Sequence, residues 1–119
     1  MDELKRKDNK RVAVEREIKI LQAAAANEIS PKIAEKAFIK NLSAGGLCIV
    51  SGMRIKKGTV IEADVMLRTD GLEKFRAYLL AVWSRESAET GCFETGAQFL
   101  GMKQEDSIGL ERYINQHLH

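Results

Sequence analysis

The stretch FIKNLSAGGLCIV, residues 38–50, decides how this chain is expected to fold. Its apolar first half breaks at the small residues SAGG, 43–46, and an apolar run resumes at Leu47. Glycines and small polar residues between two apolar runs are typical of a tight turn that joins antiparallel strands. We therefore predict short strands over 38–41 and 47–50, joined by a glycine-containing turn.

Similar strand patterns lie on both sides of this turn. In RVAVEREIKI, 11–20, and in TVIEADVMLRT, 59–69, apolar residues occupy every second position, as in a half-buried strand. The segment FRAYLLAVWSRE, 75–86, predicts a longer and more buried strand, and CFETGAQFLGM, 92–102, predicts the last strand. Short strands at this regular spacing predict an all-β dominated fold, a small antiparallel β-barrel of six to seven strands.

Individual side chains of these strands can be assigned to the inside or the outside. In 59–69 the apolar positions Ile61, Ala63, Val65 and Leu67 fall on one side. The acids that alternate with apolar strand residues predict a solvated sheet face: Glu15, Glu17, Glu62 and Asp64. Trp83 is predicted to lie in the core or at a barrel end rather than to serve as a ligand platform.

The remaining parts of the chain do not follow the strand pattern. Residues 1–10 are charged, with no apolar period, and predict a flexible basic arm ahead of a barrel domain over 11–119. In 21–37 four alanines favour a helix while Ser30-Pro31 favours a turn, so a short helix and an irregular hairpin connection both fit. Near the end, one apolar stripe with helical spacing predicts a C-terminal helix: Ile108, Leu110, Tyr113, Ile114 and Leu118.

Composition limits the classes of function. The chain has 119 residues, 45% hydrophobic and 30% charged, which is ordinary for one soluble globular domain. The net charge of +2 is too small to indicate general binding of nucleic acid. No apolar run is long enough to span a membrane, and the N-terminus lacks the apolar segment of a secretory signal. Cys48 and Cys92 are interpreted as buried small hydrophobes in a reducing, cytoplasmic compartment.

Catalytic and metal-binding patterns are not evident in the sequence. No nucleophile stands beside a plausible base, and no glycine-rich phosphate loop precedes a helix, so the chain is not expected to be an enzyme. His117 and His119 lie at the terminus away from any carboxylate or cysteine set, so neither a metal site nor a cofactor is expected.

The basic arm and the glycine turn together resemble the PilZ domain family. Its two sequence marks are Arg-x-x-x-Arg before the first strand and Asp/Asn-x-Ser-x-x-Gly after a later one. The second mark is present as Asn41, Ser43 and Gly46, whereas the first ends in Arg11 but begins with Lys7 in place of arginine. Further similarity in VIEADVML, LLAVWSRE, TGAQFLGM and IGLERYI extends the resemblance over about residues 6–118.

The resemblance implies a receptor for cyclic di-GMP, a bacterial second messenger with two phosphates and two guanines. Arginine can bond phosphate or a guanine edge through two donors, and can stack on a base, whereas lysine offers only a point charge. Asparagine and serine can bond base edges or phosphates, and glycine lets the backbone come close. The implied ligand-binding residues are Arg6, Lys7, Arg11, Asn41, Ser43, Gly45 and Gly46.

Three functions are compared on this basis. The leading hypothesis is a cyclic di-GMP receptor that orders its arm on binding and so signals to a protein partner. The second is a degenerate PilZ adaptor that binds proteins without nucleotide, which Lys7 favours. The third, a small-barrel nucleic-acid binder, usually needs exposed stacking aromatics along a basic groove, and only seven aromatic residues occur here.

Overall fold

The computed structural model describes residues 12–25, 28–29, 37–69, 72–88 and 91–117. The predicted basic arm, 1–10, therefore lies outside the described residues. The strands and the helix are β1 (Val12–Ala25), β2 (Glu28–Ile29), β3 (Ala37–Leu42), β4 (Gly46–Ser51), β5 (Val60–Thr69), β6 (Leu72–Glu86), β7 (Phe93–Met102) and α2 (Gln104–His117).

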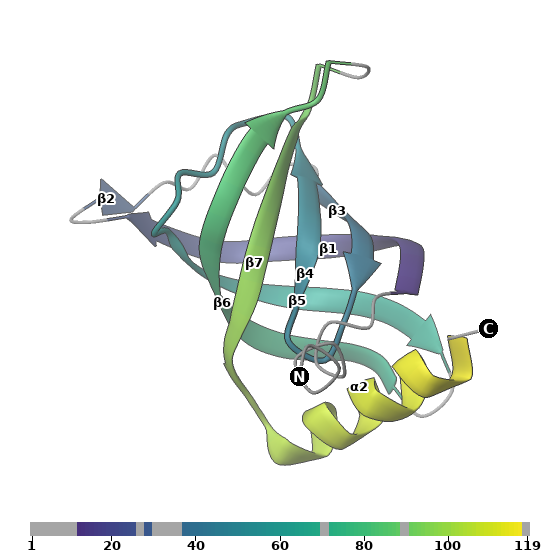
Figure 1. The fold of residues 1–119 in the computed structure, drawn as a ribbon. Coiled ribbons are helices and arrows are strands. Elements are labelled where there is room, and N and C mark those ends of the chain that lie inside the picture. Colours follow the sequence, from purple (N-terminus) through teal and green to yellow (C-terminus); the bar gives the residue numbers. More distant parts are fainter. Residues whose placement is uncertain (1–11, 26–27, 30–36, 70–71, 89–90, 118–119) are drawn as a thin grey trace, which may run out of the picture.

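The strands form an antiparallel barrel (Figure 1). Hydrogen-bonded neighbours follow the order β2-β1-β3-β4-β7-β6-β5, and an additional pairing of β1 with β5 closes the sheet on itself. The two-residue β2 pairs only with the end of β1, so six strands make up the barrel wall. The predicted fold, a barrel of six to seven strands with a C-terminal helix, is confirmed.

The core follows the predicted two-residue alternation. Ile61, Ala63, Val65 and Leu67 of β5 are all 0% exposed, and matching inward residues come from the other barrel strands. The helix α2 lies at one end of the barrel next to β6 and adds Leu110, Tyr113 and Ile114 to the core (Figure 1).

Two predictions about apolar side chains are wrong. Ile108, assigned to the buried stripe of the helix, is 48% exposed, because it lies on the side of α2 opposite Leu110. Trp83, assigned to the core or a barrel end, is 41% exposed on the outer wall. Leu118 of the predicted stripe lies outside the described residues.

The alanine run also differs from a helix. Ala23, Ala24 and Ala25 belong to β1, where Ala23 pairs with Ile61 and Ala24 with Val60. Alanine is a strong helix former, but tertiary pairing overrides this preference here because these residues complete the pairing of β1 with β5 that closes the barrel. The rest of 21–37 is described only at Glu28–Ile29 and Ala37.

Two predictions about polar residues and cysteines need correction. Asp64, predicted on a solvated face, is 9% exposed because Arg76 covers it, with Nε 2.8 Å from the carboxylate. Cys48 is buried as predicted, but Cys92 is only half-buried. Among the described residues, no helix has both the length and the apolar character needed to cross a membrane.

Candidate functional site

The turn between β3 and β4 is built by the buried hydroxyl of Ser43. The Ser43 Oγ accepts hydrogen bonds from the backbone N–H groups of Gly45 and Gly46, each at 3.2 Å, and lies 3.2 Å from the Gly46 carbonyl oxygen. The Ser43 N–H donates to the same carbonyl at 2.8 Å. Because Ser43 is 1% exposed, its hydroxyl stabilises the turn rather than projecting from it.

The two glycines of the turn bring it close to β7. A Cβ atom at Gly46 would overlap the carbonyl oxygen of Ala97, so only glycine fits at this crossing. The Gly45 carbonyl accepts a hydrogen bond of 2.9 Å from the Phe99 N–H. Asn41 to Gly46, here called the corner, is therefore a preformed unit joined to β7.

A row of paired residues runs outward from the corner across the wall of the barrel. Asn41 of β3 pairs with Cys48 of β4, Cys48 pairs with Gly96 of β7, and Gly96 pairs with Trp83 of β6. The indole of Trp83 lies directly over Gly96, where a Cβ atom would overlap the indole nitrogen. The row thus has two small residues in the middle and an amide and an exposed aromatic ring at its ends.

Bulges determine which way the ends of this row face. The register between β3 and β4 shifts between Ile39 and Asn41, so Lys40 is an extra residue in β3. Likewise the register between β6 and β7 shifts between Ala81 and Trp83. A bulge re-aims the side chains beside it, and here it places Trp83 outside the barrel rather than inside.

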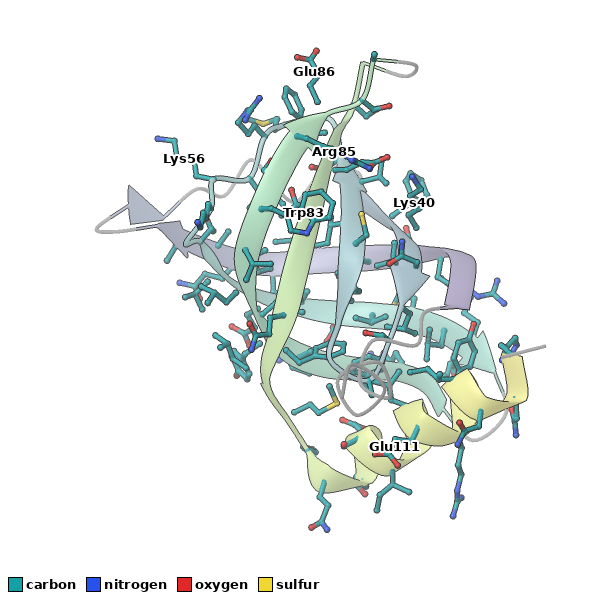
Figure 2. The ribbon with its side chains drawn as sticks, viewed as in Figure 1. Lys40, Lys56, Trp83, Arg85, Glu86 and Glu111 are labelled. Carbon is teal, nitrogen blue, oxygen red and sulfur yellow. The ribbon has the colours of Figure 1, made fainter. Side chains whose placement is uncertain are left out.

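An ion cluster borders the row two residue pairs further along β6 and β7. Glu94 of β7 lies 3.0 Å from Lys40 Nζ of β3 and 2.9 Å from Arg85 Nη2 of β6, and its side chain is only 11% exposed. The hydrogen bond from Arg85, and then that from Lys40, lowers the pKa of the Glu94 carboxyl from its ordinary value. The Arg85 guanidinium also lies 5.3 Å from the centroid of the Trp83 ring. Figure 2 shows Lys40, Arg85 and Trp83 on one side of the barrel.

The predicted site residues divide into two groups. The structure brings Asn41, Ser43, Gly45 and Gly46 together in the corner, whereas Arg6, Lys7 and Arg11 lie outside the described residues.

Sequence reasoning did not single out Lys40 and Arg85 of the outer wall beside the corner, and it assigned Trp83 to the core or a barrel end. Their strand alternation could not reveal them, because each depends on a bulge or on which strands become neighbours.

Other chemistry has little support in the described residues. No group of three or more histidine, cysteine, aspartate or glutamate side chains is placed to hold a metal ion in the described part of the chain. His117 stacks on Tyr113, with ring centroids 4.2 Å apart. The small residues and the exposed aromatic ring instead form a surface against which a planar group can lie.

Comparison with known proteins agrees with the fold. Two solved structures share it: the inhibitor of motility MotI/DgrA of Bacillus subtilis, with a TM-score of 0.70 and 14% identity over 89% of this chain, and the PilZ domain of YcgR from Escherichia coli with c-di-GMP, with a TM-score of 0.58 and 13% identity over 90% of this chain. The chain spans 48% of the length of the former and 87% of the latter. None of the curated proteins compared matches it in sequence.

The sequence profile of the PilZ domain covers nearly the whole chain, from residue 5 to residue 116. Domains of this kind are generally non-catalytic receptors, commonly of c-di-GMP. The match includes every described barrel strand and all but the last residue of α2. With the barrel, the corner and the terminal helix in place, the chain belongs to the PilZ domain family.

Proposed function

We propose that this domain is a cyclic di-GMP receptor that holds its ligand between the corner and the cations that precede β1. The observation that carries this proposal is the register of β1, whose first described residue, Val12, pairs with Leu42 of the corner. The chain therefore enters the barrel beside Asn41 and Ser43.

Covalent geometry limits how far the predicted cations can lie from Val12. Consecutive Cα atoms are about 3.8 Å apart, so Arg11 must start within that distance of Val12 whatever its conformation. Lys7 is four residues further back and can be at most about 14 Å from Arg11. Both side chains can therefore approach a dinucleotide that lies on the corner.

Each part of the surface has a distinct role in this proposal. Arg11 offers two parallel donors to a phosphate or to the O6/N7 edge of guanine, and Lys7 adds a positive charge without that fork. The Asn41 amide can bond a base edge, and the exposed ring of Trp83 offers an edge or face to a base. Ser43, Gly45 and Gly46 maintain the shape against which the ligand rests.

The charge balance predicts modest affinity. Glu94 already engages Lys40 and Arg85, so these two cations would have to loosen from a carboxylate before bonding a phosphate. Each residue of the arm that becomes ordered costs about 1 to 2 kcal/mol, while a hydrogen bond to a charged group contributes about 1.5 to 3 kcal/mol. Arm ordering on binding is the change that a partner protein would detect.

Titration calorimetry with cyclic di-GMP tests the proposal. We expect saturable binding by the unaltered chain, loss of binding in Arg11→Glu, and about tenfold tighter binding in Lys7→Arg because the arginine fork is restored. Lys57→Glu is the matched control. This exposed lysine lies in the loop that follows β4, at the end of that strand opposite the corner. The proposal is refuted if no heat is measured at high ligand concentration, or if Arg11→Glu and Lys57→Glu weaken binding equally.

A protein-binding adaptor without nucleotide is the second candidate. The ion cluster favours it, because Glu94 neutralises cations that an anionic ligand would need. The two functions differ in one variant: an adaptor keeps its protein partner after Arg11→Glu, whereas a receptor loses its nucleotide while the barrel stays folded.

A further inference from the structure

Two buried hydroxyl groups on neighbouring strands have no hydrogen-bond partner among the described residues: those of Thr95 in β7 and Ser84 in β6. Thr95 is 0% exposed, and the Ser84 oxygen is buried although the residue as a whole is partly exposed. A buried hydroxyl without a partner is unfavourable, because it gives up its hydrogen bonds to bulk water and gains none in return. Almost all such groups in native proteins bond either the protein or an ordered water, so these two hydroxyls indicate a bound molecule.

Other buried hydroxyls of the barrel are bonded directly to the backbone. Ser51 at the end of β4 donates to a backbone carbonyl at 2.7 Å, and Thr59 donates to another at 2.6 Å. In the corner, Ser43 accepts from two backbone N–H groups. Thr95 and Ser84 differ from these residues because neither reaches a backbone group.

The two unpaired hydroxyls lie side by side on the inner surface of the wall. Thr95 pairs directly with Ser84, and on its other side with Ile49 of β4, which is 0% exposed in the core. Directly paired residues point to the same face of a sheet, with Cβ atoms about 4.5–5.5 Å apart. Both hydroxyls therefore face the barrel interior, yet they do not bond each other. Two hydrogen bonds of about 2.7–2.8 Å through one water molecule can span such a separation.

The pair lies directly behind the outer wall beside the corner. Ser84 stands between Trp83 and Arg85 in β6, and Thr95 follows Glu94 in β7. Because side chains alternate along a strand, the charged groups of Arg85 and Glu94 lie on the outer side, where they bond each other. The hydroxyls that face inward are neutral, and each can donate or accept, which suits a small neutral molecule that can do both.

We propose that one internal water molecule bridges Ser84 and Thr95 and so ties β6 to β7 behind Trp83 and Arg85. Proteins hold about one buried water per 27 residues, so a chain of 119 residues has room in this respect for several. The water supplies the bond that each hydroxyl lacks, and it fixes the part of β6 that carries the exposed ring of Trp83. This proposal does not require that the corner bind a nucleotide.

A crystal structure of the full chain, at a resolution that shows ordered water, tests the proposal directly. We expect an electron-density peak about 2.7–3.2 Å from both Thr95 Oγ1 and Ser84 Oγ. Thr95→Ser keeps the hydroxyl and should keep the peak, whereas Thr95→Val has nearly the same shape without the hydroxyl and should lose it. The proposal is wrong if the unaltered chain shows no peak there, or if the peak stays in Thr95→Val.

Stability separates a bridging water from a hydroxyl that is merely unpaired. With the water in place, Thr95→Val and Ser84→Ala should each lower the midpoint of urea denaturation. The double variant should lose less than the sum of the two single losses, because both changes remove the same water. If the hydroxyl were unpaired, valine would remove an unsatisfied buried polar group and the midpoint would rise. A higher midpoint in Thr95→Val, or strictly additive losses, would overturn the proposal.

Discussion

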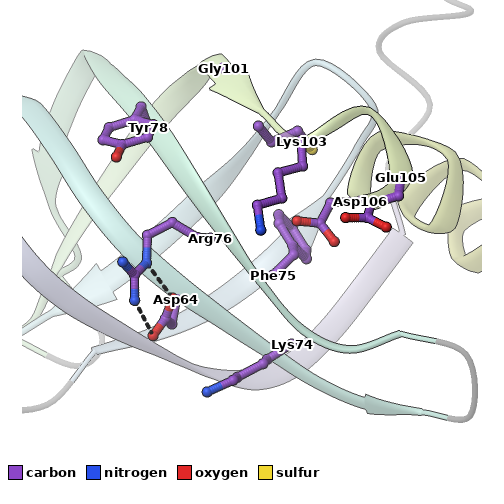
Figure 3. A pocket seen from close by; sticks show the side chains of 10 residues that line it. Asp64, Lys74, Phe75, Arg76, Tyr78, Gly101, Lys103, Glu105 and Asp106 are labelled. Atoms are coloured by element: carbon purple, nitrogen blue, oxygen red, sulfur yellow. Dashed lines mark hydrogen bonds and ion pairs between the residues drawn. The ribbon is translucent and has the colours of Figure 1, made fainter.

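The corner and the cleft where β7 continues into α2 differ in how their polar groups are used. In the corner, the Ser43 hydroxyl and the Gly45 carbonyl take part in hydrogen bonds that hold β3, β4 and β7 together. In the cleft, Lys74, Lys103, Glu105 and Asp106 all lack ion-pair partners within 4.0 Å among the described residues (Figure 3). The corner is thus a rigid platform that depends on cations from elsewhere for anion binding, whereas the cleft carries unpaired charges of both signs.

The largest expected effect comes from disrupting the rigid platform. In Gly46→Val the side chain would overlap Ala97 of β7, and because a backbone atom is in the way, the two strands must separate. We expect a loss of roughly 3 kcal/mol or more in the free energy of unfolding, measured by urea denaturation. Gly52→Val, with open space at its Cβ, should stay within about 0.5 kcal/mol of the unaltered chain. Equal stability of the two variants would show that the corner is not close-packed.

The next effect concerns the hydroxyl of the turn. Ser43→Ala removes the acceptor for the Gly45 and Gly46 N–H groups, and the Gly46 N–H is buried. We expect a loss of about 2 kcal/mol in the free energy of unfolding, because an unsatisfied buried donor costs about 1 to 3 kcal/mol. If urea denaturation gives an unchanged midpoint, Ser43 has no part in stabilising the turn.

A smaller effect is expected at the far end of the row. Gly96→Ala should push the Trp83 indole off β7 at a cost of about 1 kcal/mol, since an exposed side chain can move away. Trp83 is the single tryptophan, so its fluorescence emission should move to longer wavelength. Gly101→Ala on the same strand meets no neighbouring atom within 4 Å and should leave the emission unchanged. A shift in both variants would contradict the stacked position of the indole.

The smallest effect concerns two largely buried carboxylates, Glu94 in the ion cluster beside the corner and Asp64 of β5. Hydrogen bonds from Arg85 to Glu94 and from Arg76 to Asp64 lower the pKa of both carboxyls. Because each pKa is lower in the folded state than in the unfolded state, the two hydrogen bonds add stability at pH values above the ordinary carboxyl pKa of about 4. This added stability is lost as the pH falls through the folded-state pKa values.

The free energy of unfolding should therefore fall as the pH drops below about 5. In the double variant Glu94→Gln and Asp64→Asn, the slope of the free energy of unfolding against pH should be shallower. Urea denaturation across the acid range measures this slope. A slope identical to that of the unaltered chain would mean that neither carboxylate gains from its arginine.

Much of the barrel could be predicted from the chain alone. The alternation in β5 correctly predicted Ile61, Ala63, Val65 and Leu67 inside, and the small residues at 43–46 correctly predicted the turn. Trp83 could not be predicted, because the bulge before it reverses the side to which it points. The ion pair between Asp64 and Arg76 could not be predicted from the sequence either, because it depends on the register between β5 and β6.

The sequence by itself determined the strand pattern, the corner residues and the family, because each is expressed in local spacing of side-chain types. Only the tertiary structure decided that Asn41, Cys48, Gly96 and Trp83 form one row, and that β6 extends past the end of β7. The physical reason is that cross-strand neighbours are chosen by register and bulges, which depend on hydrogen bonds between segments far apart in the chain.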